Sequence, residues 1–526
     1  MTGKRLLLLA ALALIALWHL SLRRAYSELP LMRDEGEYAM AARIWSQGGL
    51  PYRDAFSQKP PVILLVYRAA FALWPERENG ARRLAAAASL LIMMLLLALT
   101  PRNWRWSARL AAPAFFASSS TLPIGSLGMA ANTEIFLCLW VCAAALSLSR
   151  MIESRHQARW ALLCGLFLGG ALMTKQTAIW TVAAFSALAC WQLRACRMRI
   201  LAALGLGAAL IPGLFAAYFA YRGGLDSFVQ ACFLRNLDYS GLLAVHPGLG
   251  GHLSWFFGSV VPLFLRADWP SYALALWALW GVKVSSRDFL LLPTLWLGSS
   301  LVGAFTGLLL FPYYFLQAFP ALALLASAGI ERWSGRPRLA LIMATGAALY
   351  PVFAHFRAYF SDIPPILAFR LLYPNPLFEA AHLGHVIRSR SDAGDLIYVY
   401  GSEAQVYVYA RRDPATPHVM AYPLTLFPRQ GDWQAEMARL ALAKPRYVVY
   451  STQLGSTIVS GPLGEAFQEA VRSWLERDYA LIGFIEMGKG EFLPMRGSPG
   501  EYLDWDRPPS LLLFERIRAS SSPSSG

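Results

Sequence analysis

The sequence has few charged residues. Asp, Glu, Lys and Arg make up 15% of its 526 residues, whereas hydrophobic residues make up 56%. This composition excludes a soluble multidomain chain, and the polar segments between the apolar runs exclude a simple membrane anchor, so it indicates a polytopic membrane protein. The sequence also has no CxxC pair, no glycine loop of the nucleotide-phosphate type and no internal repeat. Its six cysteines lie in or beside apolar runs and are expected to be small core residues, not disulfides or metal ligands.

Apolar and charged residues are unevenly distributed along the chain. Residues 1–356 contain the apolar runs and carry 30 Lys and Arg against 14 Asp and Glu, whereas residues 357–526 carry 17 against 18. The positive surplus therefore lies between membrane segments, where it is a topology signal and does not indicate nucleic-acid binding. We predict a transmembrane domain over 1–356, a soluble domain over 357–518 and a disordered tail over 519–526.

Basic residues gather in six short segments, which together hold 16 Lys and Arg but three acids. Short cytoplasmic loops collect Lys and Arg, so the predicted cytoplasmic turns are Lys4–Arg5, Pro101–Arg109, Arg150–Arg159, Arg194–Arg199, Lys283–Asp288 and Glu331–Arg338. The apolar runs predict about eleven transmembrane helices, near residues 6–20, 81–100, 109–125, 134–149, 160–173, 178–193, 200–221, 262–282, 289–309, 313–330 and 339–356. An odd number of spans from a cytoplasmic N-terminus places the C-terminal domain outside, in the periplasm if the chain lies in a bacterial inner membrane.

Short β-branched and aromatic runs alternate with helical patterns in the soluble part. The runs predict strands over Leu396–Tyr400, Gln405–Tyr409, Tyr447–Tyr450, Ala480–Ile485 and Leu511–Phe514, and amphipathic stretches predict helices over Asp432–Ala443 and Gly464–Trp474. This alternation is typical of a small α/β domain. No nucleotide-binding glycine fingerprint follows these strands, so we assign the domain no chemistry.

Three carboxylates occur within four residues of the first outer loop, in the segment Arg33-Asp34-Glu35-Gly36-Glu37-Tyr38. One explanation is local, because Asp34 as N-cap with Glu37 three residues later matches a capping box. The other is functional, because an acid at the membrane surface can accept a proton from a substrate. The two explanations are compatible, since Glu37 can cap the helix while Asp34 or Glu35 faces a cavity.

Lysine is rare, with six residues against 41 arginines, and in the membrane part only Lys59 and Lys175 are expected on the outer face. Each lies in a tight polar turn next to an apolar run. A lysine at such a boundary can extend its ammonium group to the interface without any further role. A compact cation at this depth is also suited to a phosphate group at the level of the lipid headgroups.

Six features occur in order along the chain: RDEGEYA at 33–39, QKPP at 58–61, the pair Arg82-Arg83, AANTE at 130–134, TKQ at 174–176 and PYYFLQAFP at 312–320. With these features, residues 1–330 resemble the GT-C glycosyltransferases of the ArnT and protein O-mannosyltransferase superfamily, and within it the bacterial RgtA-like branch. Enzymes of this kind often end in a periplasmic α/β domain. The resemblance therefore implies a GT-C-like membrane fold followed by such a domain.

The resemblance also implies an inverting transfer of a sugar from a polyprenyl-phosphate-linked donor to a hydroxyl group of a lipid, glycan or protein outside the membrane. It matches Asp34 to the catalytic aspartate that takes the proton of this hydroxyl, with Glu35 as its acidic companion. Lys59 matches the lysine that holds the donor phosphate. Arg82 and Arg83 lie where family arginines approach that phosphate, and Lys175 is a further candidate. The candidates for substrate binding are Glu37, Tyr38, Asn132, the second-loop acid Glu134, Tyr313, Tyr314 and Gln317.

The sequence departs from the family's pattern at two positions. In ArnT-like enzymes the position of Gln58 is often occupied by an acidic residue that helps to bind a metal. Whether this chain binds a divalent metal is therefore left open, and no cofactor is assigned. Pro312 replaces a histidine that often precedes the tyrosine pair, which weakens the match of the residues after it. The alternative function is a transporter or flippase of lipid-linked sugars. Such proteins typically have charged or broken helices near the membrane midplane and repeated halves. This chain is expected to concentrate its charge on one face and has no internal repeat, which favours the enzyme.

Overall fold

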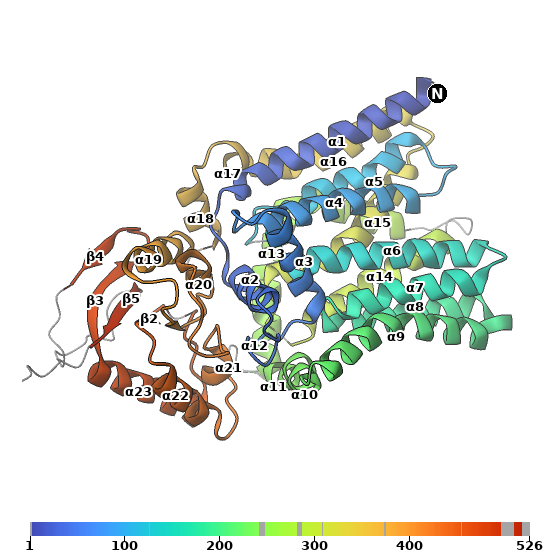
Figure 1. Cartoon of the computed structure of the whole chain (residues 1–526). Coiled ribbons are helices and arrows are strands. Elements are labelled where there is room, and N and C mark those ends of the chain that lie inside the picture. Colours follow the sequence, from blue (N-terminus) through green and yellow to red (C-terminus); the bar gives the residue numbers. More distant parts are fainter. Residues whose placement is uncertain are drawn as a thin grey trace, which may run out of the picture. The chain divides into compact units, whose positions relative to one another are not determined.

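The computed structural model of the chain is mostly helical and describes residues 3–125, 127–240, 248–280, 287–307, 309–372, 375–453, 455–495 and 510–517. The predicted tail over 519–526 lies outside the described residues. The chain forms two compact units, whose elements are labelled in Figure 1. The membrane unit comprises Met1–Glu28, Gln58–Trp74 and Asn79–Leu367, and the α/β unit comprises Leu29–Ser57, Pro75–Glu78 and Ala368–Gly526.

Each apolar run of the membrane unit forms a helix. Among the described residues, six helices are long and apolar enough to cross a membrane, which confirms the prediction of a helical membrane protein. The apolar helix α3 was not among the predicted spans. The main helices are α1 (Gly3–Ser27), α3 (Pro61–Leu73), α4 (Gly80–Leu99), α5 (Trp106–Ser119), α6 (Thr133–Glu153), α7 (Gln157–Leu172), α8 (Ile179–Gln192), α9 (Arg197–Tyr221), α10 (Leu225–Val229), α11 (Arg235–Ser240), α12 (Gly248–Trp255), α13 (Val261–Leu279), α14 (Arg287–Phe305), α15 (Phe319–Glu331), α16 (Pro337–Ala354), α17 (Phe356–Phe360) and α18 (Pro364–Leu372).

Glycines allow helices α7 and α9 to pack closely. A Cβ atom at Gly165 would overlap the carbonyl oxygen of Leu204, and one at Gly207 would overlap that of Leu162. Small residues at such a contact let two backbones approach in lipid, where the burial of apolar groups does not drive helices together. Figure 1 shows α6, α7, α8 and α9 running alongside one another, so this part of the unit is a tightly packed bundle.

Helix α13 is broken at Asp268, where the backbone is not helical (φ −155°, ψ 43°) and Pro270 follows. The side chain of Asp268 is fully buried and accepts a hydrogen bond from the Ser119 hydroxyl at 2.5 Å. Arg266, two residues earlier, is exposed, and its carbonyl accepts a hydrogen bond from the Tyr350 hydroxyl at 3.2 Å. Asp268 is therefore held by a hydroxyl group in the interior of the unit, whereas the side chain of Arg266 lies at its surface.

The α/β unit is built on a five-stranded sheet with the strand order β1-β2-β5-β3-β4. Strands β1 and β2 are parallel, and the other pairs are antiparallel. The predicted strand over Gln405–Tyr409 is wrong: this segment forms helix α20, in which every residue but Tyr409 is buried. The elements are α2 (Arg33–Ser46), α19 (Leu377–Arg390), β1 (Ile397–Tyr400), α20 (Gln405–Ala410), α21 (Tyr422–Thr425), α22 (Asp432–Ala443), β2 (Tyr447–Ser451), α23 (Gly461–Asp478), β3 (Tyr479–Glu486), β4 (Phe492–Pro494) and β5 (Ser510–Arg516).

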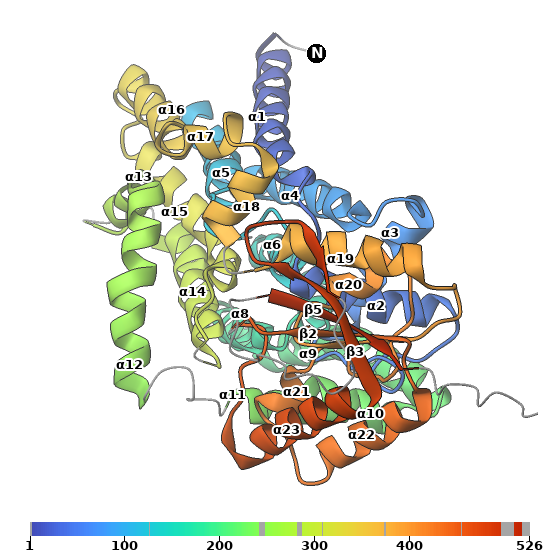
Figure 2. The ribbon, with the colours of Figure 1, turned by 90° about the vertical axis from the view of Figure 1, so that its left-hand side faces the viewer.

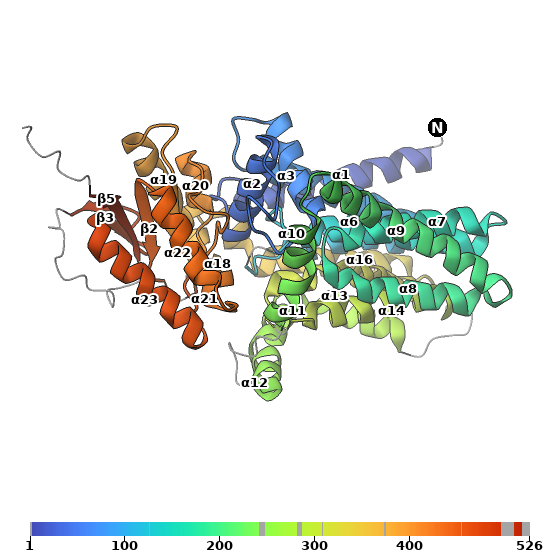
Figure 3. The ribbon, with the colours of Figure 1, turned by 60° about the horizontal axis from the view of Figure 1, so that its bottom comes forward.

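Helices cover both faces of this sheet. Helices α22 and α23 contribute Leu440, Phe467 and Trp474 to a core with alternate residues of the strands, among them Tyr400 and Phe514. Helix α19 contacts β3 and β5 and packs against α20. Figures 2 and 3 show α22 and α23 side by side beneath the strands, with α19 and α20 on the other side. The unit therefore buries its sheet in the layered manner of an α/β domain.

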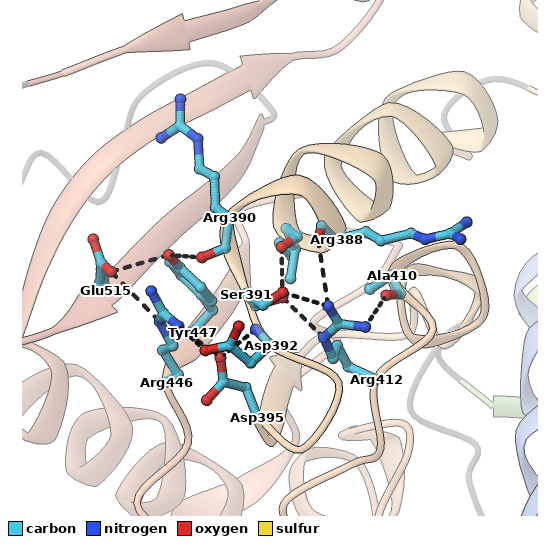
Figure 4. Close-up of polar contacts among 11 residues, drawn as sticks. Arg388, Arg390, Ser391, Asp392, Asp395, Ala410, Arg412, Arg446, Tyr447 and Glu515 are labelled. Atoms are coloured by element: carbon cyan, nitrogen blue, oxygen red, sulfur yellow. Dashed lines mark hydrogen bonds and ion pairs between the residues drawn. The ribbon is translucent and has the colours of Figure 1, made fainter.

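Arginines fix the connection between α19 and β1 (Figure 4). The buried guanidinium of Arg412 donates hydrogen bonds to the carbonyl of Ser391 at 2.5 Å, to its hydroxyl at 2.9 Å and to the carbonyl of Arg388 at 3.3 Å. These acceptors include the last carbonyls of α19, which have no partner within the helix. Arg446 donates to Asp395 at 2.7 Å. Burial raises the pKa of Asp395, but hydrogen bonds from the Asp392 backbone and from Arg446 lower it below its ordinary value.

Candidate active site

Helix α2 carries the three acids of the first outer loop and belongs to the α/β unit. The helix begins at Arg33, after the N-cap Met32, and a carboxylate oxygen of Glu35 accepts a hydrogen bond from the Met32 backbone N–H at 3.0 Å. The predicted capping pair of Asp34 and Glu37 is therefore wrong, because the helix starts two residues earlier than the sequence suggests. Glu35 takes the position of the capping acid instead.

The other two acids of α2 differ in environment. Glu37 is buried, and its carboxylate accepts a hydrogen bond from the buried Ser57 hydroxyl at 2.6 Å. Asp34 is half-buried. Tyr38 is 1% exposed, so it is a buried core residue. Asp34 is thus the most accessible carboxylate of the cluster.

The membrane unit contains a cavity of about 370 Å³ with two lysines in its wall. Lys59 and Lys175 form its cationic part, and Gln176 and Asn236 add side-chain amides. Most of the remaining wall is apolar, including Trp180, Phe233, Leu237 and Leu309. The structure therefore brings together the two lysines that the sequence singles out, although they are 116 positions apart in the chain.

Lys175 forms a buried ion pair with Glu134. Its ammonium nitrogen lies 2.5 Å from a carboxylate oxygen of Glu134, and the two side chains are 7% and 1% exposed. The other carboxylate oxygen accepts a hydrogen bond from the Thr133 hydroxyl at 3.1 Å. The ammonium also lies over the ring of Tyr314, 3.9 Å from its centroid, in the geometry of a cation–π contact. Glu134 and Tyr314 therefore fix the position of the Lys175 ammonium at the cavity.

Two side-chain amides hold the turn that carries Lys59. Gln176 donates hydrogen bonds to the carbonyl oxygens of Gln58 at 2.8 Å and Cys232 at 2.7 Å. Asn236 donates to the same two carbonyls, at 3.0 Å and 2.8 Å. Pro61 then opens helix α3, where proline is favoured because its missing N–H would have no partner. The role of Asn236 could not be predicted from the sequence, since a single asparagine in a loop carries no local signal of this contact.

The adjacent arginines Arg82 and Arg83 point in different directions. Arg82 is buried and donates a hydrogen bond to the Tyr26 carbonyl at 2.9 Å. Arg83 is exposed, and its guanidinium lies 5.2 Å from the ring centroid of Trp74. Neither arginine contributes to the wall of the lysine cavity. The predicted role of these arginines at the donor phosphate is therefore not linked to this cavity.

Of the other predicted substrate-binding residues, Asn132, Tyr313 and Gln317 lie in the membrane unit. Gln317 donates a hydrogen bond to the Tyr314 carbonyl at 3.0 Å, and the rings of Tyr313 and Tyr314 meet edge to face at 4.8 Å. Asn132 is buried directly before helix α6. Among the described residues, no three His, Cys, Asp or Glu side chains gather in a group that could hold a metal ion.

The fold agrees with that of known proteins. A family model described as dolichyl-phosphate-mannose-protein mannosyltransferase matches residues 58–217. The structure of ArnT from Cupriavidus metallidurans in the apo state covers 98% of both chains with a TM-score of 0.57 and 15% identity. ArnT bound to undecaprenyl phosphate covers the same shares with a TM-score of 0.54 and 15% identity.

A second structure of this fold is an oligosaccharyltransferase from Archaeoglobus fulgidus, tethered with an acceptor peptide. The match covers 98% of this chain and 76% of the oligosaccharyltransferase chain, with a TM-score of 0.51 and 13% identity. A search of curated proteins gives no match. The chain thus shares its fold with ArnT, and six helices of its described part are long and apolar enough to cross a membrane. The family model and this shared fold confirm the resemblance of the chain to the GT-C glycosyltransferase superfamily.

Proposed function

We propose that the protein transfers a sugar from a polyprenyl-phosphate-linked donor to a hydroxyl group of a lipid, glycan or protein acceptor. The observation that carries this proposal is the cavity in the membrane unit, which combines two lysines with a largely apolar wall. A lipid phosphate has the same two properties, an anionic group and a hydrocarbon chain. Ammonium groups form strong charge-assisted hydrogen bonds with phosphate oxygens, whereas the apolar wall suits the chain.

Lys59 and Lys175 have different parts in this proposal. The carboxylate of Glu134 offsets the charge of Lys175, so Lys175 acts as an oriented hydrogen-bond donor. Lys59, which is half-buried in its turn, adds a second cationic group to the cavity wall. Together they stabilise the phosphate as it becomes the leaving group. A well-placed donor in a water-poor site typically contributes about 3–4 kcal/mol to such stabilisation.

The proposed reaction is a single displacement at the anomeric carbon. The acceptor oxygen forms a bond to this carbon while the bond from the carbon to the phosphate oxygen breaks, so the configuration inverts. The proton of the acceptor hydroxyl passes to the carboxylate of Asp34, and polyprenyl phosphate leaves. Glu35 keeps the first turn of α2 in place through its hydrogen bond to Met32.

Chain connectivity supports the joint action of these groups. Glu37 of the acidic helix binds the Ser57 hydroxyl, and Ser57 is followed directly in the sequence by Gln58 and Lys59. The peptide chain thus joins the acidic segment to the turn that carries the lysine. We place the reaction outside the cytoplasm, with the α/β unit in the periplasm of a bacterium, because the basic segments between helices favour that topology.

The proposal is tested by incubating purified protein with a panel of polyprenyl-phosphate sugars and measuring which donor is consumed. Asp34→Asn is expected to lower turnover of that donor by roughly 100-fold or more, because a general base contributes ~10²–10⁴ to the rate. Asp392→Asn is a matched control, since its side chain is 94% exposed in the α/β unit. Full activity of Asp34→Asn would remove the assigned base, and no consumption of any donor by the wild type would refute the function.

One observation favours the alternative of a transporter or flippase for lipid-linked sugars. Helix α13 is broken at the buried Asp268, and broken helices with ionisable groups are typical of transporters. The two functions differ in their products. Movement of an intact labelled lipid-linked sugar across proteoliposomes, without release of polyprenyl phosphate, would support the transporter.

A further inference from the structure

We propose that the α/β unit positions the catalytic acid, with Arg33, Gly36 and Glu403 as positioning residues for Asp34. This inference rests on the proposed function, because it assumes that Asp34 is the general base. It assigns a role to the sheet-containing part of the chain, for which the sequence indicates no chemistry. Helices α2 and α20 lie side by side within this unit (Figure 1).

The first contact is an ion pair of the residue next to Asp34. The Arg33 guanidinium lies 2.9 Å from a carboxylate oxygen of Glu403, whose side chain is fully buried. The same guanidinium donates to the Gly455 carbonyl at 2.9 Å and to the Gln453 side-chain oxygen. Arg33 is therefore tied to three groups that are more than 360 positions away in the sequence.

Glu403 is itself held in place by its surroundings. Its second carboxylate oxygen accepts hydrogen bonds from the Ser456 hydroxyl at 2.5 Å and from the Ser402 backbone N–H at 3.1 Å. These donors fix the orientation of the Glu403 carboxylate independently of Arg33. A buried carboxylate is costly unless it is paired, so the loss of either partner of the ion pair is expected to loosen the other.

The second contact is a close approach of two backbones at Gly36. Glycine inside a helix costs roughly 0.5–1 kcal/mol relative to alanine, so its presence in α2 needs a reason. A Cβ atom at Gly36 would lie 2.7 Å from the Cα of Gln405 and 2.8 Å from the carbonyl carbon of Ala404. Alanine would favour the helix but push α2 away from α20.

A third contact lies before the helix, where the Leu31 backbone N–H donates a hydrogen bond to the Tyr409 hydroxyl at 2.8 Å. The three contacts involve Leu31, Arg33 and Gly36, so they bracket Asp34 on both sides in the sequence. A general base must be held close to its productive position, because a displacement of about 1 Å can cost ~100-fold in rate.

The test uses the full-length protein and the donor that the panel identifies. Glu403→Gln is expected to lower kcat by roughly 10–100-fold while the KM for the donor stays within about twofold, because the lipid-phosphate cavity is unchanged. Hydrogen exchange of the amides at 31–40 is expected to accelerate in the same variant. Glu436→Gln is the matched control, since it also neutralises a buried carboxylate of the α/β unit and is expected to leave both measurements unchanged.

Two further variants keep the inference testable if Glu403→Gln folds poorly. The double variant Arg33→Gln with Glu403→Gln is expected to lose about as much activity as the worse single variant, because both single variants break the same ion pair. Gly36→Ala is expected to lower kcat and to accelerate exchange at 31–40, whereas Gly394→Ala, at a position with open space around it, does neither.

The outcomes separate this inference from the proposed function. If the wild type consumes no donor, the proposed function fails, and the catalytic purpose of the three contacts fails with it. If the wild type is active but Glu403→Gln and Gly36→Ala keep its kcat, only the inference is overturned. It is also overturned if Glu436→Gln lowers kcat as much as Glu403→Gln does, because the effect is then one of general stability.

Discussion

Replacing Lys175 by methionine is expected to reduce both the stability of the membrane unit and its affinity for a lipid phosphate. The ammonium of Lys175 is 2.5 Å from Glu134, and the two side chains are 7% and 1% exposed. Lys175→Met leaves a buried carboxylate without its counter-ion, which typically costs about 3–5 kcal/mol. At roughly 2 °C of thermal midpoint per kcal/mol for a large domain, the midpoint should fall by about 6–10 °C.

Variants of Glu134, the partner of Lys175 in the ion pair, are expected to change stability and binding in different directions. Glu134→Gln also breaks the pair and should lower the midpoint, but it frees the Lys175 ammonium and should tighten binding of undecaprenyl phosphate. The double variant Lys175→Met with Glu134→Gln removes both charges at nearly constant volume, so it should be more stable than either single variant.

The assay is thermal unfolding of the purified protein in detergent, together with titration by undecaprenyl phosphate. Loss of one charge-assisted hydrogen bond, worth about 1.5–3 kcal/mol, should weaken binding to Lys175→Met by roughly 10–100-fold. Additive losses of stability in the double variant would refute the role of the ion pair. Tighter binding to Lys175→Met than to the wild type would refute the place of this lysine at the phosphate.

Three further predictions concern single side chains. Lys59→Ala should weaken binding of undecaprenyl phosphate by roughly tenfold or more, whereas Lys489→Ala, which removes an exposed lysine of the α/β unit, should leave the same titration unchanged. Arg412→Lys should lose most of the stability that Arg412→Ala loses, about 2–3 kcal/mol, because an ammonium cannot reproduce the planar fork that reaches several carbonyls; a Lys variant with the wild-type thermal midpoint would contradict this. Burial raises the pKa of Glu436, but the charge and hydrogen bond of His418 and the hydrogen bond of Thr416 lower it below its ordinary value of 4.5. The unfolded chain therefore binds more protons near that pH, so stability should fall as the pH drops below 4.5 towards the folded pKa, and Glu436→Gln should show a flatter dependence.

The helices of the membrane unit could be predicted from the sequence because apolar runs of this length have few alternatives in a bilayer. In the α/β unit, the amphipathic pattern over Asp432–Ala443 coincides with helix α22. The prediction of a strand over Gln405–Tyr409 was wrong, because valines and tyrosines favour a strand only where a neighbouring strand pairs with them. The burial of this segment between α2 and α19 is a property of the tertiary structure.

The candidate site was predictable only in its composition. The scarcity of lysine drew attention to Lys59 and Lys175, and the structure places both in one cavity. The partner of Lys175 was not predictable as such, since Glu134 is 41 positions away. The same holds for the contact of Arg33 with Glu403, because no local pattern reports on a residue 370 positions further along the chain.

The order of the chain through the two units limits how they can be recombined. The polypeptide passes from one unit to the other after Glu28, Ser57, Trp74, Glu78 and Leu367, so the units are interlaced and are not consecutive modules. A chimera joined at a single point near residue 367 would combine the acidic helix of one parent with the sheet of another. A chimera that exchanges the α/β unit between relatives should therefore take residues 29–57 and all residues after 367 from the same parent.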